Sequence, residues 1–396
     1  MYLLKYTLRN QPPDKNNVYQ YQQANRYFAQ IAGGLEPAGA EELASLGAKN
    51  ISESYRGAYF NADKATLYRV NYQSRLATRI LAPLLEFDCH SDKYLYKTAQ
   101  SMQWTDFMGN EDTFAVFANV SNSNISHSKF AALRLKDAIV DQFREHTGER
   151  PNIDTRNPDL WINLHIEDNH ATISLDTSGG SLHRRGYRVD SNKAPIQETV
   201  GAAIIKYSEW DGSTKLYDPF CGSGTLLFEG LMHYANIPAG YLRKHFGFER
   251  MPDYDASLWQ EVRAEIDALI REVPEGLIAG SDRDRPSIEM AKENAKQLVH
   301  GEHIKFGVSD FRALDNFEGY TIVTNPPYGI RMGDSEMMAE FYKSIGDFLK
   351  QKCTGTNAYI YFGNREWIKK VGLRPTWKKP LVNGALDGRL VKYEMY

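Results

Sequence analysis

The sequence has few cysteines and no long apolar run, and each absence excludes a class of protein. Cys89, Cys221 and Cys353 are the cysteines of a 396-residue chain, and they form no CxxC pair. This excludes a disulfide framework or a cysteine-based zinc site and is typical of a reducing compartment. No stretch approaches the roughly 18 apolar residues that span a bilayer, and the amino end, with Lys5 and Arg9, lacks the apolar core of a signal peptide. The sequence therefore predicts a soluble, cytoplasmic protein.

Net charge is also nearly absent. The 47 lysines and arginines almost balance 50 aspartates and glutamates, giving a formal net charge of −3. The chain is therefore not globally basic, although a local basic face is enough to bind a nucleic acid. Its length predicts two or three domains, each able to bury a core.

The first part of the chain predicts a flexible extension followed by a small domain. Residues 1–25 include a polar stretch with little to bury, which favours flexibility. From residue 26 strands alternate with helices on a short spacing, which predicts a small α/β, ferredoxin-like domain over 26–110. The expected strands are 27–31, 54–60 and 85–89, and the expected helices are 36–46 and 64–81.

The expected helix 64–81 carries three arginines at intervals, with tyrosines between them and no acidic residue. The basic residues are Arg69, Arg75 and Arg79, and the aromatic ones are Tyr68 and Tyr72. A face of this composition can contact phosphates and bases. The alternative is a solvated helix face with buried tyrosines.

A second module is predicted over residues 111–178. It begins with a strand at 113–119, an Asn/Ser-rich loop and a helix at 129–146, and it ends with paired strands at 160–166 and 170–176. The helix contributes basic side chains at Lys129, Arg134 and Lys136, and the linker 179–193 adds Arg184 and Arg185. His127 and His146 have no second ligand at helical spacing, so we expect no metal here.

This order of modules resembles the THUMP-containing RNA-modifying enzymes, in which THUMP is the RNA-binding domain. The resemblance implies that residues 111–178 form the THUMP domain and that the basic residues named above contact RNA. One branch, the thiouridine synthetases, uses an SGGxDS loop. Here Ser178-Gly-Gly-Ser181 is followed by Leu182 and His183, so that branch is rejected.

The carboxyl half, residues 194–396, begins with a strand that leads into a glycine turn. Asp218-Pro-Phe-Cys-Gly-Ser-Gly-Thr225 precedes an apolar helical pattern, so backbone amides at a helix start can face a ligand. A nicotinamide-binding loop would require a third glycine near Leu227 and an acid about 20 residues on, and neither is present. The sequence also lacks a Walker lysine.

The Asp218–Thr225 stretch resembles motif I of S-adenosylmethionine-dependent amino-methyltransferases. The resemblance implies that the cofactor is held by Asp218, Phe220, Gly222, Gly224 and Thr225. It also implies a ribose-binding acid at Asp282, which ends the strand 276–282, and an adenine-binding pair at Asp310 and Phe311, which follow the strand 303–306. Cys221 is then a small loop residue, not a nucleophile.

The strand 321–324 leads into Asn325-Pro326-Pro327-Tyr328, which is the proposed reaction centre. Two prolines fix φ and end the strand, so the groups around them are held rigidly at the sheet's edge. The Asn325 side-chain oxygen and the Pro326 carbonyl would accept hydrogen bonds from both N–H groups of an exocyclic base amine. These hydrogen bonds would localise the lone pair on the amine nitrogen. Tyr328 would stack on the flipped base, and Asn325 also borders the cofactor. No metal is implied.

The predicted architecture is a class I methyltransferase, a Rossmann-like seven-stranded sheet with a terminal antiparallel hairpin, preceded by an α+β region that contains THUMP and binds RNA. Chains with THUMP and Asn-Pro-Pro-Tyr-Gly resemble guanine-N2 methyltransferases of 23S rRNA in bacteria and of tRNA in others, and rRNA is favoured. The same four residues occur in adenine-N6 DNA methyltransferases, which is the nearest alternative. A non-catalytic RNA-binding assembly factor is disfavoured by the intact motifs, and the sequence assigns no oligomeric state.

Overall fold

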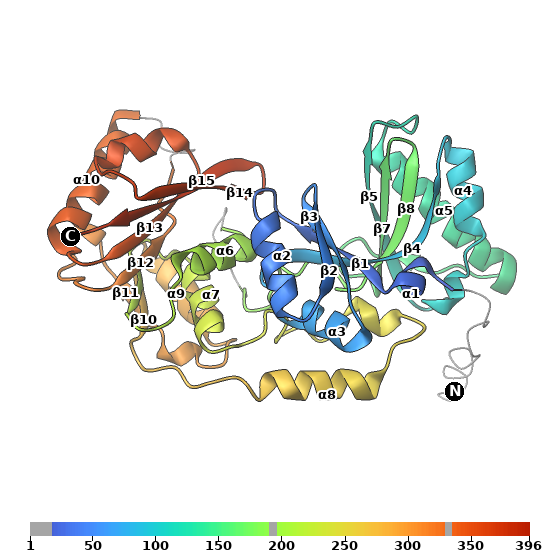
Figure 1. The fold of residues 1–396 in the computed structure, drawn as a ribbon, viewed down its shortest axis with the longest axis horizontal. Coiled ribbons are helices and arrows are strands. Elements are labelled where there is room, and N and C mark those ends of the chain that lie inside the picture. Colours follow the sequence, from blue (N-terminus) through green and yellow to red (C-terminus); the bar gives the residue numbers. More distant parts are fainter. Residues whose placement is uncertain (1–17, 190–195, 329–334) are drawn as a thin grey trace.

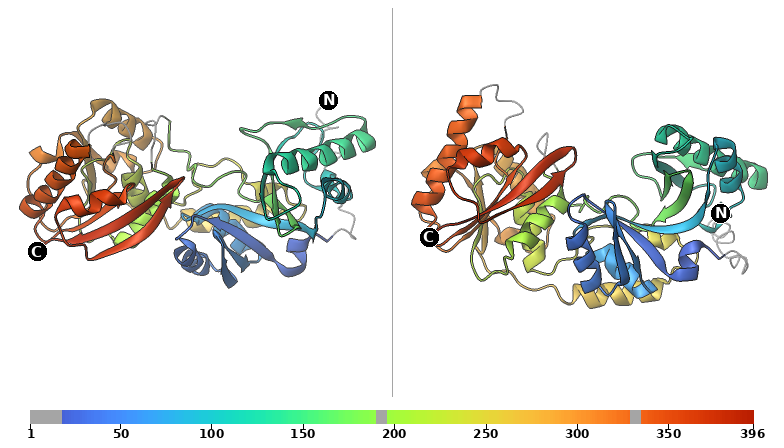
Figure 2. Two further views of the ribbon diagram at one scale, coloured as in Figure 1. Left: turned by 90° about the horizontal axis from the view of Figure 1, so that it is seen from above. Right: turned by 45° about the horizontal axis from the view of Figure 1, so that its top comes forward.

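The structure is a computed structural model that describes residues 18–189, 196–328 and 335–396. It contains two mixed sheets at opposite ends of an elongated molecule (Figures 1 and 2). One sheet has eight strands in the order β2-β3-β1-β4-β8-β7-β5-β6, and the other has seven in the order β11-β10-β9-β12-β13-β15-β14. No helix within the described ranges is long and apolar enough to cross a membrane.

The eight-stranded sheet holds both amino-terminal modules. Its strands are β1 (Arg26–Ile31), β2 (Lys49–Ser54), β3 (Gly57–Asn61), β4 (Ala77–Asp88), β5 (Thr113–Ser121), β6 (Asn152–Ile153), β7 (Leu160–Glu167) and β8 (His170–Asp176). Its helices are α1 (Gln20–Ala24), α2 (Glu36–Ser45), α3 (Lys64–Gln73), α4 (Asp92–Gln100) and α5 (Ser128–Thr147), with a 3-10 turn η1 at Trp104–Asp106. The polar edge strand β2 and the helix α4 were not predicted.

The predicted helix 64–81 is wrong beyond Gln73, because its second half is the start of β4. That strand pairs with β1 on one side, where Ala29 opposes Ile80, and with β8 on the other, where Leu81 opposes Asp176. A strand with a partner on each side gains two ladders, and this tertiary pairing overrides the helical spacing of its apolar residues. β4 therefore joins the two predicted modules into one sheet.

Two tyrosines within residues 18–25 are packed against the rest of the protein, whereas the sequence predicted this stretch as part of the flexible extension. Tyr19 and Tyr21 are buried. Their hydroxyls donate to Asp106 and Asp253 over 2.6 Å in each case. The prediction failed here because the polar stretch contains two rings that find core positions and carboxylate partners. Residues 1–17 lie outside the described ranges.

The second sheet has seven strands and ends in an antiparallel hairpin, β14–β15, as the sequence predicted. Its strands are β9 (Leu216–Asp218), β10 (Ile278–Asp282), β11 (Lys305–Val308), β12 (Thr321–Thr324), β13 (Asn357–Phe362), β14 (Trp377–Asn383) and β15 (Leu386–Glu394). The helices around it are α6 (Glu198–Ser208), α7 (Thr225–Tyr234), α9 (Arg285–Ala295) and α10 (Ser335–Lys352), whereas α8 (Ala256–Asp267) belongs to an insertion between α7 and β10. The 3-10 turns are η2 (Gly247–Arg250), η3 (Gly301–His303), η4 (Phe311–Ala313) and η5 (Arg365–Val371).

The insertion between α7 and β10 is an arm that packs against the amino-terminal half. Its helix α8 lies beneath α3 in Figure 1, and the two helices are in contact. Rings from both halves form one cluster, with Tyr68 4.5 Å from Phe248 and Tyr72 5.2 Å from Trp259 between centroids. The Tyr72 hydroxyl also donates to Asp267 over 2.7 Å. The arm therefore fixes the two halves to each other.

Candidate active site

The predicted site residues gather at the carboxyl edge of the parallel strands. Strand order reverses between β9 and β12, which are neighbours in the sheet. Ligands of open α/β sheets bind outside the strand ends at such a reversal. Asp218, Asp282 and Asn325 end or follow β9, β10 and β12 respectively, so three distant parts of the sequence meet at this point.

The glycine loop between β9 and α7 is held by its own carboxylates. Asp218 Oδ1 accepts hydrogen bonds from the Phe220 amide over 3.0 Å and from the Thr324 hydroxyl over 2.6 Å. The Gly222 amide donates to Asp282 Oδ2 over 3.0 Å, which joins the loop to β10. Gly222 and Gly224 have φ values of 52° and 93°, where a side chain would strain the backbone. The loop therefore presents bare backbone toward the strand ends.

The two carboxyl groups of the loop have raised pKa values. Burial raises the pKa of Asp218 to about 7, and the negative charge of Asp282 adds to this against the hydrogen bonds from Thr324 and Phe220. Burial likewise raises the pKa of Asp282. A cation bound nearby would favour the ionised form of both groups. The contacts of Asp218 within the protein are those of a residue that holds the loop in place.

The Asn325-Pro326-Pro327-Tyr328 turn is braced on both sides. Asn325 Oδ1 is buried and has no hydrogen-bond partner in the structure. The Pro327 carbonyl accepts from the Tyr342 hydroxyl over 3.1 Å. The Tyr328 ring packs on Gly363 so closely that a Cβ added there would lie 2.9 Å from the ring. The turn thus holds an unused acceptor in a fixed position.

The predicted adenine-binding pair follows β11. Asp310 Oδ1 accepts from the Arg312 amide over 3.0 Å and so starts the turn η4. Phe311 is buried, with its ring 4.9 Å from Phe220 and 5.8 Å from Phe341. The three rings form a cluster that includes Phe220 of the glycine loop. The contacts of Asp310 and Phe311 with a cofactor stay a prediction.

Arg188, which the sequence analysis did not select, reaches the same loop from the predicted linker. Its guanidinium donates to Thr225 Oγ1 over 3.1 Å and to Glu198 Oε1 over 3.0 Å. Beside it, Asn294 accepts from the Val189 amide over 2.8 Å and donates to the Ser223 carbonyl over 3.2 Å. No local pattern could have revealed this brace, since its members lie far apart in the chain.

Three of the arginines that were predicted to bind RNA make ion pairs and hydrogen bonds within the protein, so their assignment is corrected. Arg185 is fully buried and pairs with Glu229 over 3.2 Å. Arg75 donates to the carbonyls of Met232 and Ile237 over 2.8 and 2.6 Å. Arg79 pairs with Asp176 and lies over the rings of Phe117 and Trp161. Their charges are used to join elements, so these side chains are not available to phosphates.

The remaining predicted RNA contacts are more accessible. Arg69 and Arg134 form ion pairs of 3.5 Å with Glu265 and Asp92, and Lys136 pairs with Asp137 over 2.6 Å. Lys129 and Arg184 are exposed. The single basic face predicted for 64–81 does not exist, because Arg69 lies on α3 and Arg79 on β4.

Taken together, the fold and the site define a class I methyltransferase. The seven-stranded order with its terminal hairpin, the glycine loop after the first strand and the acid ending the second are the features that hold S-adenosylmethionine in this class. The bare loop, the two carboxylates and the unpartnered Asn325 oxygen fit such a donor and an amine acceptor beside it.

Comparison with known proteins agrees with this class. The family described as RMKL-like, methyltransferase domain, matches residues 185–392, the THUMP family matches 89–176, and the RlmL ferredoxin-like domain matches 26–81. The chain is 39% identical over 372 residues to a putative RNA methyltransferase of Synechocystis sp., covering 93% of this chain and 97% of that protein. The chain belongs to the RMKL-like methyltransferase family and carries a THUMP domain before its methyltransferase domain.

A second relative is longer than this chain. Ribosomal RNA large subunit methyltransferase K/L of Syntrophotalea carbinolica is 39% identical over 383 residues, which cover 93% of this chain and 53% of that protein. The chain thus spans about half the length of this relative. Among solved structures, a putative methyltransferase complexed with SAH superposes with a TM-score of 0.81 at 27% identity, covering 94% of this chain and 98% of the other.

Proposed function

We propose that the chain transfers a methyl group from S-adenosylmethionine to an exocyclic amine of an RNA base, and that this amine is guanine N2 in 23S ribosomal RNA. The observation that carries the proposal is the buried Asn325 Oδ1, which has no hydrogen-bond partner among the described residues. A buried acceptor without a partner costs free energy, so it is retained where a substrate supplies the donor.

The reaction needs an activated methyl group and a usable lone pair. The cofactor, when bound, supplies a sulfonium methyl that is already activated. Asn325 Oδ1 and the Pro326 carbonyl accept hydrogen bonds from the two N–H groups of the amine and hold its nitrogen pyramidal. Tyr328, fixed against Gly363, stacks on the base after it has left its helix. Because Tyr342 holds the Pro327 carbonyl, these acceptors need little rearrangement before reaction.

Ribosomal RNA is favoured over other substrates by the THUMP match and by the name of the K/L relative. Guanine N2 is favoured by the combination of THUMP with Asn-Pro-Pro-Tyr-Gly. The alternatives are guanine N2 in tRNA and adenine N6, since the Asn-Pro-Pro-Tyr turn accepts either amine.

Nucleoside mass spectrometry distinguishes these substrates. We expect 23S rRNA from cells lacking the protein to lose one N2-methylguanosine, and plasmid-borne wild-type protein to restore it. Restoration by Asn325→Ala would contradict the site. Loss of N6-methyladenosine from rRNA, or of N2-methylguanosine from tRNA alone, would contradict the proposed substrate and support the corresponding alternative.

Cofactor affinity is expected to rise as the pH is raised through about 7. The pKa of Asp218 is raised to about 7, chiefly by burial, and that of Asp282 is raised in the same way. A cationic cofactor favours the ionised carboxylates, so binding releases protons below this pH and the dependence flattens above it. Calorimetric titration from pH 6 to 8 measures it. In Asp218→Asn the change of cofactor affinity with pH should shrink to the part that Asp282 contributes. An unchanged pH dependence would contradict the role of Asp218.

A further inference from the structure

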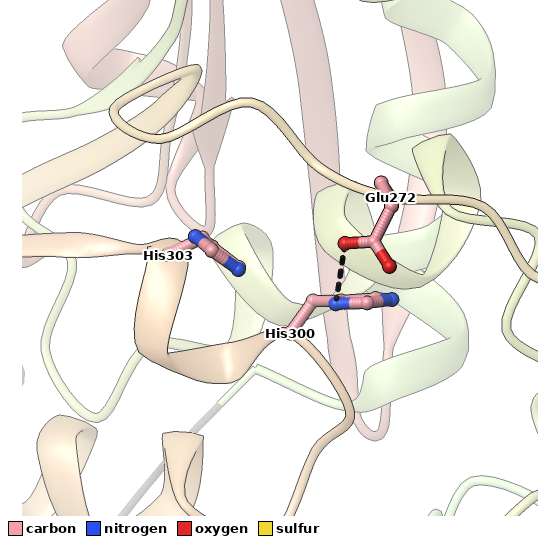
Figure 3. A group of neighbouring side chains, drawn as sticks. All are labelled: Glu272, His300 and His303. Carbon is pink, nitrogen blue, oxygen red and sulfur yellow. Dashed lines mark ion pairs between the residues drawn. The ribbon is translucent and has the colours of Figure 1, made fainter.

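A cluster of potential metal ligands lies at the opposite edge of the catalytic sheet from the active site. It comprises Glu272, His300 and His303, whose ligand atoms all lie within 4.8 Å of one another (Figure 3). His303 precedes the first residue of β11, so the cluster lies at the amino ends of the parallel strands. Asp218, Asp282 and Asn325 lie at the carboxyl ends. The cluster therefore takes no part in the site described above.

The two histidines are held close together by a short turn. The His303 amide donates to the His300 carbonyl over 3.1 Å across η3. His300 is the N-cap of η3, with a φ of 63°, and the centroids of the two imidazole rings lie 5.9 Å apart. Gly301 packs against the Ala295 carbonyl without room for a Cβ, which anchors the turn on α9. The turn therefore fixes the distance between the backbones of the two histidines.

The carboxylate comes from a different segment, the end of the arm where it returns to the sheet. Arg271 donates from its amide to the Ala235 carbonyl over 3.0 Å, and Val273 is buried, so the backbone on both sides of Glu272 is fixed. The Glu272 side chain points out and meets His300 Nδ1 at 3.6 Å. The Gly276 amide donates to the His303 carbonyl over 3.4 Å, which ties the returning segment to the same turn.

We propose that Glu272, His300 and His303 bind one divalent transition-metal ion, Zn²⁺ in preference to Mg²⁺, which clips the returning end of the arm to the catalytic domain. Two imidazoles and one carboxylate are a donor set that suits zinc, whereas magnesium prefers oxygen ligands alone. Three protein ligands leave a coordination position for water.

The geometry allows the ion to bind without moving the backbone. Zinc bonds to imidazole nitrogen and carboxylate oxygen are about 2.0–2.2 Å long, so tetrahedral donors lie closer together than the 4.8 Å limit found here. The exposed Glu272 side chain can follow the ion by rotation from its contact with His300, and rotation of the two imidazoles about their own side-chain bonds has to close the remaining distance. Glu302, 3.6 Å from His303 Nε2, adds a second negative charge beside the site.

Binding is tested on full-length protein that has no polyhistidine tag and has been stripped of metal. Calorimetry with Zn²⁺ should show one equivalent bound to the wild type, and Co²⁺ should give the visible spectrum of a tetrahedral site. Zn²⁺ should also raise Tm, which shows that the folded state is the one that binds. The double variant H300A/H303A should lose the bound equivalent and the Tm shift.

His245→Ala is the matched control. The exposed His245 pairs with the partly buried Glu249 over 3.4 Å, and this pair belongs to no three-residue group among the described residues. We expect the His245→Ala variant to bind Zn²⁺ as the wild type does. Glu272→Gln, at a mostly exposed side chain, should weaken binding without loss of fold and decides the matter if the double variant does not fold. A wild type that binds no equivalent, or Glu272→Gln and H300A/H303A variants that bind as the wild type does, would overturn the proposal.

Discussion

Asn325→Ala is expected to lower the rate of methyl transfer on the order of 10³-fold and to leave cofactor affinity nearly unchanged. Removal of one preorganised hydrogen-bonding group at a reacting centre costs about 10²–10³-fold. Here the lost oxygen is also the one that localises the amine lone pair. Since Asn325 Oδ1 has no hydrogen-bond partner in residues 18–189, 196–328 and 335–396, its removal leaves no other group in these ranges unsatisfied. Single-turnover assays with labelled cofactor measure the rate, and calorimetry measures the affinity.

Asn364→Ala is the control for this prediction. Asn364 follows β13, the neighbouring strand, and its side chain accepts from the Glu366 amide over 3.0 Å at the start of η5. It is therefore an amide at the same edge of the sheet with a local structural partner. Turnover in this variant should stay near that of the wild type. Unchanged turnover in Asn325→Ala would remove the proposed mechanism, and a parallel loss of cofactor affinity would show that Asn325 holds the cofactor site together.

The catalytic half could be predicted because its signals are local. The turns that follow β9 and β12 need particular residue types, so they can be recognised in the sequence. The glycines of Asp218–Thr225 and the prolines of Asn325–Tyr328 are examples. The order of these turns in the chain determines which strand ends carry them, and parallel strands bring their carboxyl ends to one edge. The meeting of Asp218, Asp282 and Asn325 at one edge of the sheet follows from this.

The amino-terminal half was predicted less well because its signals depend on distant partners. The sequence around a basic residue does not reveal whether the partner of its side chain is a phosphate or a buried carboxylate. Arg75, Arg79 and Arg185 find partners in α7, its following loop and β8, which lie far away in the chain. The ring cluster of the arm raises the same difficulty, since Trp259 is a core residue only when α3 lies against it.

Glu229→Gln is expected to lower the free energy of unfolding by about 3–5 kcal/mol, the usual cost of breaking a buried ion pair. Glu229 and Arg185 are both fully buried, and Glu229 counteracts the effect of burial and holds the pKa of Arg185 above its ordinary value. The same carboxylate faces Arg75, whose pKa is lowered by burial and by the charge of Arg185. Its loss therefore leaves two guanidinium groups without their shared counter-charge.

Denaturant unfolding of matched variants separates this cost from that of an ordinary ion pair. Glu265→Gln removes the exposed partner of Arg69, a pair of 3.5 Å, and should cost less than about 1 kcal/mol. The double variant Arg185→Met with Glu229→Met should recover much of the stability, because it removes the buried charges from both sides. If Glu229→Gln costs no more than Glu265→Gln, then Arg185 finds its counter-charge elsewhere and the buried pair does not hold the linker to α7.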